Sequence, residues 1–268
     1  MLGASGKEKA RLTAKLLELM CIFRPKKQRY LEAMVKEDAR LLLEYEPMQQ
    51  WFREVFGEGY KIRGVYEPAA NDVDGAEKGV PMSHEEANEH RANPFFRTGV
   101  NDSYSLNCQT CVVAYELRRR GYDVMAVPRD NYATGILANL VSLAWVDPTT
   151  GTYPVRQVNA KVSNGKQAVK WFEGAVKQGE RYLLTVNLDG GGGHVVILTR
   201  NEDGVLMVYD PQSGDRFLGE KEILDSFMRR VEVKYSMQEG FSPAILRVDN
   251  AQVNVPFIRK IIRRRHDP

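Results

Sequence analysis

The first 56 residues carry apolar side chains at spacings of three and four, which is the period of an amphipathic helix. The stretch KEKARLTAKLLELMCIF shows this spacing, Pro25 interrupts it, and RYLEAMVKEDARLLLEY resumes it up to Pro47. We therefore predict a small helical N-terminal region at residues 1–60. Cys21 lies on its apolar face and is expected to be a buried thiol.

Residues 61–93 lose this period and are rich in Gly, Asn, Pro and acidic residues, which is typical of a connecting segment. One short helix is expected at SHEEANEHR, where Ser83 and Glu86 have the spacing of a capping box. His84 and His90 are six residues apart, which does not bring two metal ligands to one helix face. Both are expected at the surface.

From residue 94 the pattern is mixed. A helix is predicted from Cys108 to Arg120, ending at Gly121. Apolar runs of strand length follow at 122–127, 141–146, 181–188, 194–200, 205–210, 232–235 and 244–249, and helical patterns lie at 166–178 and 221–230. Strands joined by short turns favour antiparallel pairing, so we predict an α+β domain at 94–255 with a helix packed on an antiparallel sheet. Residues 256–268 form a basic C-terminal tail.

The composition, 43% hydrophobic and 27% charged over 268 residues, is that of an ordinary globular protein with one or two cores. No apolar run reaches the length of a membrane span, and the N-terminus lacks the apolar stretch of a signal peptide. Synthesis in the cytoplasm without a signal peptide is expected. Three cysteines are too few for a disulfide scaffold, so reduced thiols are expected.

A net charge of +3 does not indicate nucleic acid as a partner. The positive charge does gather in the tail, whose basic residues are Arg259, Lys260, Arg263, Arg264 and Arg265. We interpret this tail as a solvated, frayed helix end. The alternative is a patch for an acidic partner, nucleic acid or anionic lipid.

The stretch NCQTC at 107–111 contains two cysteines that could be a metal clip, a redox couple, part of a disulfide framework, or a nucleophile with a buried neighbour. Asn107 is a good N-cap residue, which places Cys108 in the first helical turn, where free N–H groups stabilise a thiolate. Cys111 then falls on the inward face with Val112 and Tyr115. The reverse assignment, with Cys111 as nucleophile, stays open.

His194 is the candidate base for such a nucleophile, since it stands between a glycine run and the apolar strand VVIL. The sequence HVVILTRNEDGVLMVYDPQ predicts a hairpin with the three-residue turn Glu202-Asp203-Gly204. That turn makes Val196 oppose Asp210 and His194 oppose Gln212, so Asp210 lies diagonal to His194 on one face. Asp210 could also simply initiate a turn before Pro211.

Two rival sites use the same residues. A zinc site of Cys108, Cys111, His194 and Asp210 lacks the second tight ligand pair usual for structural zinc. A thioredoxin-like couple needs a core strand before its CxxC, whereas FRTGVNDSYSLN is polar. No metal and no cofactor are therefore expected.

The stretch NCQTCVVAYELRRRGYDVMAVP, followed by GGHVVIL and VYDPQSG, resembles the papain-fold toxin domain of bacterial polymorphic toxins and of mobile-element or phage proteins. The resemblance covers about residues 90–250 and implies a papain-like fold. It implies Cys108 as nucleophile, or less favourably Cys111, with His194 as base and Asp210 as the acid. Asn107 and Gln109 are candidates for the second oxyanion donor, and Gln212 is a polar supporting residue.

The resemblance further implies a cysteine hydrolase acting on side-chain or peptide amides of a protein substrate, as a glutamine deamidase or a protease. Members are toxins or effectors, delivered by specialised secretion and neutralised by an immunity protein. A transglutaminase-type acyl transferase would use the same thioester. A further alternative is a non-catalytic module of a phage or mobile element that binds through its helical arm and basic tail.

Overall fold

The structure is a computed structural model that describes residues 72–73, 76–88, 92–100, 102–129, 141–149, 154, 156–236, 240–258 and 261–264. The chain divides into two units, and the account below concerns the unit formed by Gly64–Tyr235 and Ser242–Pro268. The helical region predicted at residues 1–60 lies outside the described residues.

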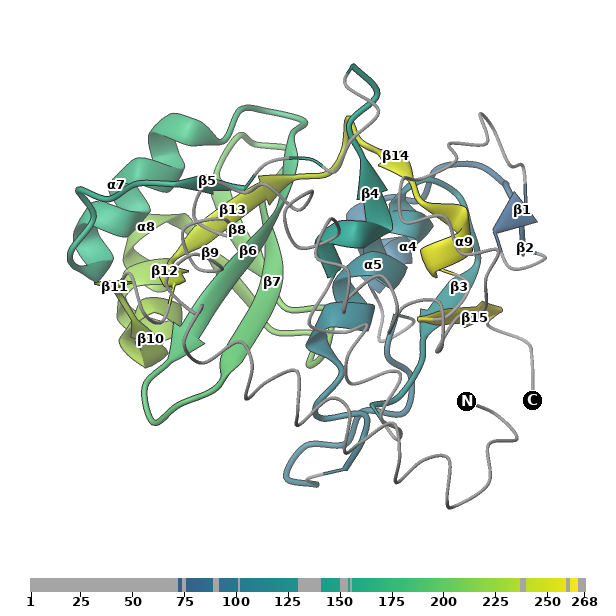
Figure 1. The fold of residues 1–268 in the computed structure, drawn as a ribbon, viewed down its shortest axis with the longest axis horizontal. Coiled ribbons are helices and arrows are strands. Elements are labelled where there is room, and N and C mark those ends of the chain that lie inside the picture. The colour runs from purple at the N-terminus through teal and green to yellow at the C-terminus, as the bar shows by residue number, and fades with distance from the viewer. Residues whose placement is uncertain are drawn as a thin grey trace, which may run out of the picture. The chain divides into compact units, whose positions relative to one another are not determined.

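A seven-stranded antiparallel sheet forms the centre of the described unit (Figure 1). Its spatial order is β5 (Gln157–Val158), β13 (Ala244–Arg247), β6 (Arg181–Leu188), β7 (Gly193–Arg200), β8 (Leu206–Tyr209) and β9 (Arg216–Leu218), while β10 (Val231–Glu232) pairs with the end of β6. The long strands β6 and β7 each carry consecutive buried apolar residues, Leu183–Leu184 and Val195–Leu198, because both of their faces are covered.

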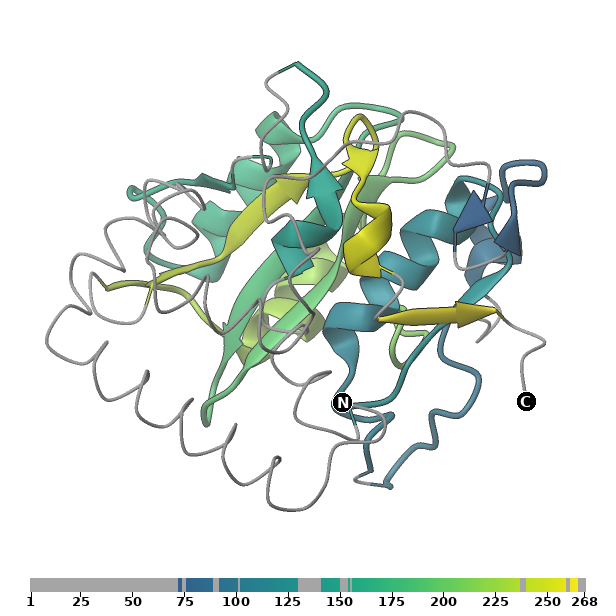
Figure 2. The same ribbon diagram turned by 45° about the vertical axis from the view of Figure 1, so that its right-hand side comes forward.

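One face of the sheet is covered by α7 (Gly165–Ala175) and by a helical stretch made of α8 (Gly219–Glu222), a π-helical turn (Ile223–Phe227) and a 3-10 turn (Met228–Arg230). The core there contains Phe172 and Phe227 from the helices and Val208 from β8. Tyr209, the next residue of β8, points the other way and contacts Tyr115 of α5 (Cys108–Arg119), with ring centroids 5.0 Å apart. The sheet therefore separates α5 from α7 and α8 (Figures 1 and 2).

The helix α5 is buried almost all round, and Gly121, with a φ of +100°, follows its end as predicted. The chain then forms β3 (Val124–Ala126), which pairs with β15 (Ile262–Arg264). Ile262 is buried in this pairing. The interpretation of the tail as a solvated helix end is therefore wrong for residues 262–264, because burial of its isoleucines favours a strand against β3.

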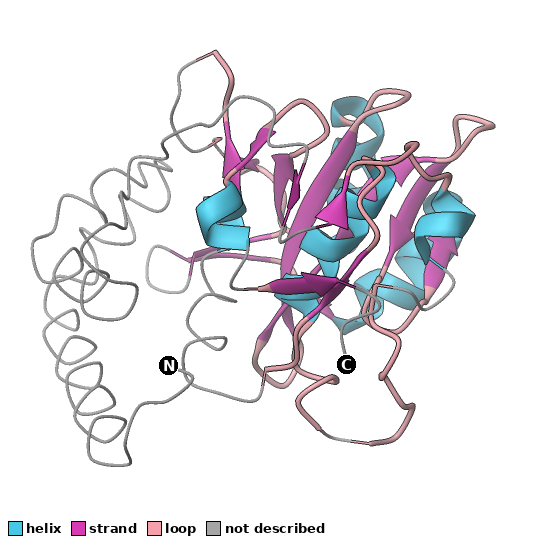
Figure 3. Ribbon diagram, turned by 90° about the vertical axis from the view of Figure 1, so that its right-hand side faces the viewer, coloured by secondary structure: helices cyan, strands magenta, loops and turns pink. Residues whose placement is uncertain are grey.

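Figure 3 shows helices and strands together in the described unit, as the mixed pattern from residue 94 predicts. The capping box of α4 (His84–Asn88) is confirmed, since Ser83 N donates to Glu86 Oε2 at 2.8 Å and Glu86 N donates to Ser83 Oγ at 3.2 Å. The strand predicted at 141–146 is wrong for its first part: Val141–Ala144 form a 3-10 turn, and only Trp145–Val146 form β4.

The strand predicted at 232–235 is divided between β10 and β11 (Lys234–Ser236). The remaining elements of the described chain were not predicted, and they are β1 (Asp72–Val73), β2 (Ala76–Glu77), β12 (Gly240–Ser242), β14 (Gln252–Val253), which pairs with β4, and α9 (Val255–Ile258). Among the described residues, none of the helices has the length and apolar character needed to cross a bilayer. The α+β class with an antiparallel sheet is confirmed.

Candidate active site

The start of α5 places the two cysteines of NCQTC in different surroundings. The helix begins at Cys108, directly after Asn107, whose carbonyl oxygen accepts hydrogen bonds from Thr110 N at 3.0 Å and Cys111 N at 3.1 Å. The side chain of Asn107 makes no capping bond and is buried instead. Cys108 is 8% exposed and Cys111 is fully buried one turn later, and both thiols are free.

The hairpin of β7 and β8 has the predicted three-residue turn. Asn201 N donates to Val205 O at 2.9 Å, and Gly204 has a φ of +78°. The pairing of Ile197 with Tyr209 continues the same register, which sets Val196 against Asp210 beyond the end of β8. The predicted diagonal of His194 and Asp210 follows from this register.

His194 and Asp210 are in direct contact, with 2.6 Å between His194 Nε2 and Asp210 Oδ2. Asp210 also initiates the turn after β8, because its Oδ1 accepts a hydrogen bond from Gln212 N at 2.9 Å. One carboxylate thus serves both purposes that the sequence had presented as alternatives.

Cys108 also interacts with the imidazole of His194. Burial lowers the pKa of His194, but hydrogen bonds with Asp210 and Cys108 and the charges of both groups outweigh burial and raise it to about 10. The raised pKa favours the protonated form of His194 at neutral pH, next to the acidic groups of Asp210 and Cys108. Burial, followed by the charges of Cys108 and Asp210, raises the pKa of Cys111 well above its usual range, so Cys111 stays a neutral thiol.

The supporting residues proposed from sequence differ in what they do. Asn107 donates both side-chain N–H groups inside the protein, to Asn93 Oδ1 and Val127 O, each at 3.2 Å. Gln212 is buried and donates from Nε2 to Asn107 Oδ1 at 3.2 Å. Gln109 is half-buried, and its buried Oε1 has no hydrogen-bond partner within the described part of the chain. The first backbone N–H groups of α5, on Cys108 and Gln109, have no intrahelical acceptor.

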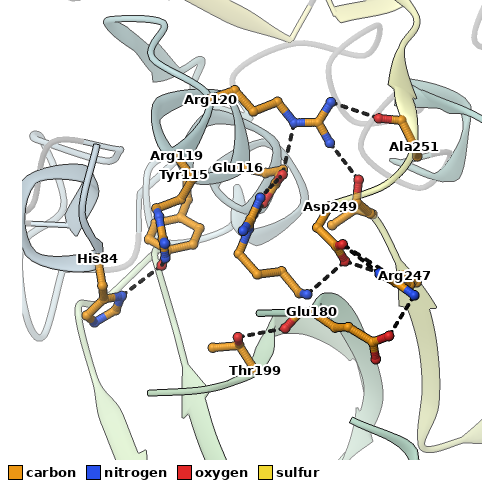
Figure 4. A network of polar contacts seen from close by, with 12 residues as sticks. His84, Tyr115, Glu116, Arg119, Arg120, Glu180, Thr199, Arg247, Asp249 and Ala251 are labelled. Carbon is orange, nitrogen blue, oxygen red and sulfur yellow. Dashed lines mark hydrogen bonds and ion pairs between the residues drawn. The ribbon is translucent and has the colours of Figure 1, made fainter. Parts of the chain in front are cut away.

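Buried charges fix α5 against the sheet (Figure 4). Glu116, fully buried, accepts two hydrogen bonds from Arg181 of β6, at 2.7 and 2.9 Å, and one from Arg120, at 2.9 Å. Burial raises the pKa of Glu116, but the bonds and charges of the two arginines outweigh it and lower the pKa below its ordinary value. Arg120 continues to the carbonyls of Val248 and Ala251, at 2.5 and 2.8 Å.

The prediction that His84 lies at the surface is wrong. His84 Nδ1 is 2.7 Å from Tyr115 Oη, and the ring packs edge-on against Tyr209 at 4.7 Å between centroids. Burial is the main cause that lowers its pKa. His84 is the first residue of α4, and its ring contacts Tyr115 of α5. No local sequence pattern indicates this contact. His90 lies outside the described residues.

Only two of the five basic residues of the tail, Arg263 and Arg264, lie among the described residues. Arg263 donates from Nη2 to Tyr104 Oη at 3.2 Å, and its guanidinium lies 5.4 Å from the centre of the Phe95 ring. Arg264 is an exposed residue of β15. The other tail cations, Arg259, Lys260 and Arg265, lie outside the described residues.

In the described part of the chain, no group of three or more His, Cys, Asp or Glu side chains is arranged to hold a metal ion.

A protein-family model described as papain fold toxin 1, glutamine deamidase, matches residues 106–215. The resemblance to the papain-fold toxins is confirmed over this segment. The papain-fold segment begins just before Cys108 and contains His194 and Asp210, and its α+β architecture is the papain-like fold expected from sequence. No curated protein matches the chain.

No sequence pattern indicated a role for Asn93, which lies outside the papain-fold segment but contacts Asn107 and Gln212. Asn93 is 1% exposed and its Nδ2 lies 3.3 Å from Asn107 Oδ1 and 3.1 Å from Gln212 O. The residue stands in the irregular stretch ANPFF, where no periodic pattern marks an inward side chain.

Proposed function

We propose that the papain-like domain hydrolyses glutamine side-chain amides of a protein substrate, with Cys108, His194 and Asp210 as a catalytic triad. The observation that carries the proposal is the imidazole of His194, whose Nε2 lies 2.6 Å from Asp210 Oδ2 and whose pKa is raised by both Asp210 and Cys108. Because Nε2 is taken by Asp210, Nδ1 is the nitrogen that serves Cys108. The family match supports the amide of glutamine as the bond that is broken.

In the proposed reaction the imidazolium of His194 stabilises the Cys108 thiolate, which attacks the amide carbon. The backbone N–H groups of Cys108 and Gln109, at the positive end of α5, stabilise the oxyanion that forms. His194 then gives its proton to the departing nitrogen, and ammonia leaves as the thioester forms. Neutral His194 next removes a proton from water, whose oxygen attacks the thioester and releases glutamate and the free thiol.

Asp210 holds the ring in one tautomer throughout these steps and stabilises the imidazolium. Asn107 and Gln212 are supporting residues in this scheme, because their hydrogen-bonding groups are directed into the protein. The proposal makes the protein a toxin or effector that is delivered to a target cell and is neutralised by an immunity protein.

The proposal is tested by incubating the full chain, and its Cys108→Ala variant, with an extract of bacterial cells. A protein glutamine that gains about one dalton only with active Cys108 is the expected result, since hydrolysis replaces –NH2 by –OH. Cys108-dependent fragments would instead mean proteolysis, and Cys108-dependent incorporation of an added primary amine would mean acyl transfer. No Cys108-dependent change in the extract would overturn the proposed hydrolase.

A further inference from the structure

Behind the Cys108–His194 pair lies a group of buried polar side chains that no step of the proposed reaction uses. We call this group the amide clamp, and its members are Asn93, Asn107, Cys111 and Gln212. It joins the loop before α5, the first turn of α5 and the turn after β8, which are the segments that carry Cys108 and Asp210.

The side-chain oxygen of Asn107 is the centre of the clamp. It accepts hydrogen bonds from Asn93 Nδ2 at 3.3 Å, from Cys111 Sγ at 3.2 Å and from Gln212 Nε2 at 3.2 Å. Three donors from three segments therefore meet on one buried acceptor, immediately before Cys108. Each donor fixes the position of Asn107, and Asn107 fixes the start of α5.

Asn93 connects this centre to the turn that carries Asp210. Its Nδ2 also lies 3.1 Å from Gln212 O and 3.0 Å from Tyr104 O. The backbone N–H of Gln212 in turn donates to Asp210 Oδ1 at 2.9 Å. A short chain of hydrogen bonds thus runs from Asn93 to the carboxylate that holds His194.

Cys111 takes part in the clamp as a thiol and not as a thiolate. Its Sγ is fully buried and donates to Asn107 Oδ1, so a negative charge on the sulfur would lose this bond and face an oxygen instead. The second cysteine of NCQTC thereby acquires a role that differs from that of the first.

We propose that Asn93 and Cys111 are positioning residues, which keep Cys108 aligned with His194 and Asp210 through Asn107 and Gln212. This rests on the proposed function, in which Cys108 is the nucleophile. A displacement of an ångström between nucleophile and base is enough to slow a reaction strongly. Loss of either donor should therefore alter Cys108 itself, without any contact to the substrate.

The test measures alkylation of Cys108 by iodoacetamide in the full chain between pH 5 and 9, with the adduct located by mass spectrometry. Cys111→Ala and Asn93→Ala are expected to slow alkylation at neutral pH by about tenfold or more and to move the rise in rate to higher pH. Cys111→Ser replaces one donor by another and is expected to keep the rate and the profile of the parent chain.

The control is Thr199→Ala, which removes a buried hydroxyl that donates to Glu180 O at 2.8 Å and therefore has its partner outside the clamp. Thermal unfolding of all variants separates loss of stability from loss of alignment. The proposal is overturned if Cys111→Ala matches Cys111→Ser, or if both alanine variants of the clamp keep the profile of Thr199→Ala. If Cys108 of the parent chain reacts no faster than Cys21, the proposed function fails and the clamp with it.

Discussion

His194 illustrates how burial and two neighbours set the protonation of one side chain. Burial alone would lower the pKa of an imidazole, because the interior disfavours its charged form. The carboxylate of Asp210 and the sulfur of Cys108 reverse this, and the pKa reaches about 10. The side chains of His194 and Asp210 are 17% and 14% exposed, so water screens their attraction only weakly.

The raised pKa of His194 predicts a pH-dependent stability. In the unfolded chain His194 titrates near 6.5, whereas in the folded chain it titrates near 10. Its contribution is therefore complete below about pH 6.5 and is lost as the pH rises to about 10, at up to about 1.4 kcal/mol per pH unit. Urea unfolding of the parent chain and of His194→Gln at intervals from pH 6 to 10 measures this slope as the difference between the two.

Asp210→Asn is the control for that slope. It keeps the size of the side chain and removes the charge, so the pKa of His194 should fall and the slope should end at a lower pH. The chain has four histidines, which makes the His194 ring signals simple to follow by NMR over the same range. Parallel stability curves for the parent chain and His194→Gln would contradict the ion pair.

The β7–β8 hairpin is the element that brings Asp210 to His194. Its three-residue turn requires Gly204 at a φ of +78°, and Leu206 and Val208 are fully buried beyond it. A slip by one residue would exchange the two buried faces of β8 and move Tyr209 away from Tyr115, so packing on both faces holds the register independently of the turn.

Gly204→Ala is therefore expected to cost about 1–2 kcal/mol of unfolding free energy without disturbing the site. The added Cβ would meet Gln178 Oε1 at 3.5 Å, an ordinary contact, so the cost comes from the backbone conformation. Urea unfolding measures the cost, and the alkylation rate of Cys108 reports on the site. Glu202→Ala in the same turn is the control, and it is expected to change neither the unfolding free energy nor the alkylation rate of Cys108. Slower alkylation of Cys108 in Gly204→Ala would mean that the turn, and not the core, sets the register of the hairpin.

At the scale of the whole molecule, the sequence was most informative where contacts are local. The helix start at Asn107, the turn ending in Gly204 and the register that follows all depend on residues a few positions apart. The amide clamp and the β3–β15 pair were not predictable in this way. Asn93 and Gln212 are 119 residues apart in the sequence. Ile262 pairs with Ala126, although most of the papain-fold segment lies between them in the sequence. Such pairs leave no period in the sequence, because each partner is a single residue in an irregular or terminal stretch.

The last prediction separates an enzyme from a binding module. If the protein is a toxin that acts through its triad, its production in bacteria should arrest growth, and Cys108→Ala should abolish the arrest. Replacing the tail cations Arg259, Lys260, Arg264 and Arg265 by glutamine should then leave the arrest intact, whereas a module that binds an acidic partner through its tail requires the reverse. Growth curves with matched protein levels measure the difference. Arrest by the Cys108→Ala chain would contradict the catalytic role, and normal growth with the parent chain would contradict the toxin role. Because Cys108 is almost fully buried, it is not part of a binding surface, and a folded Cys108→Ala chain that no longer arrests growth therefore supports the catalytic role.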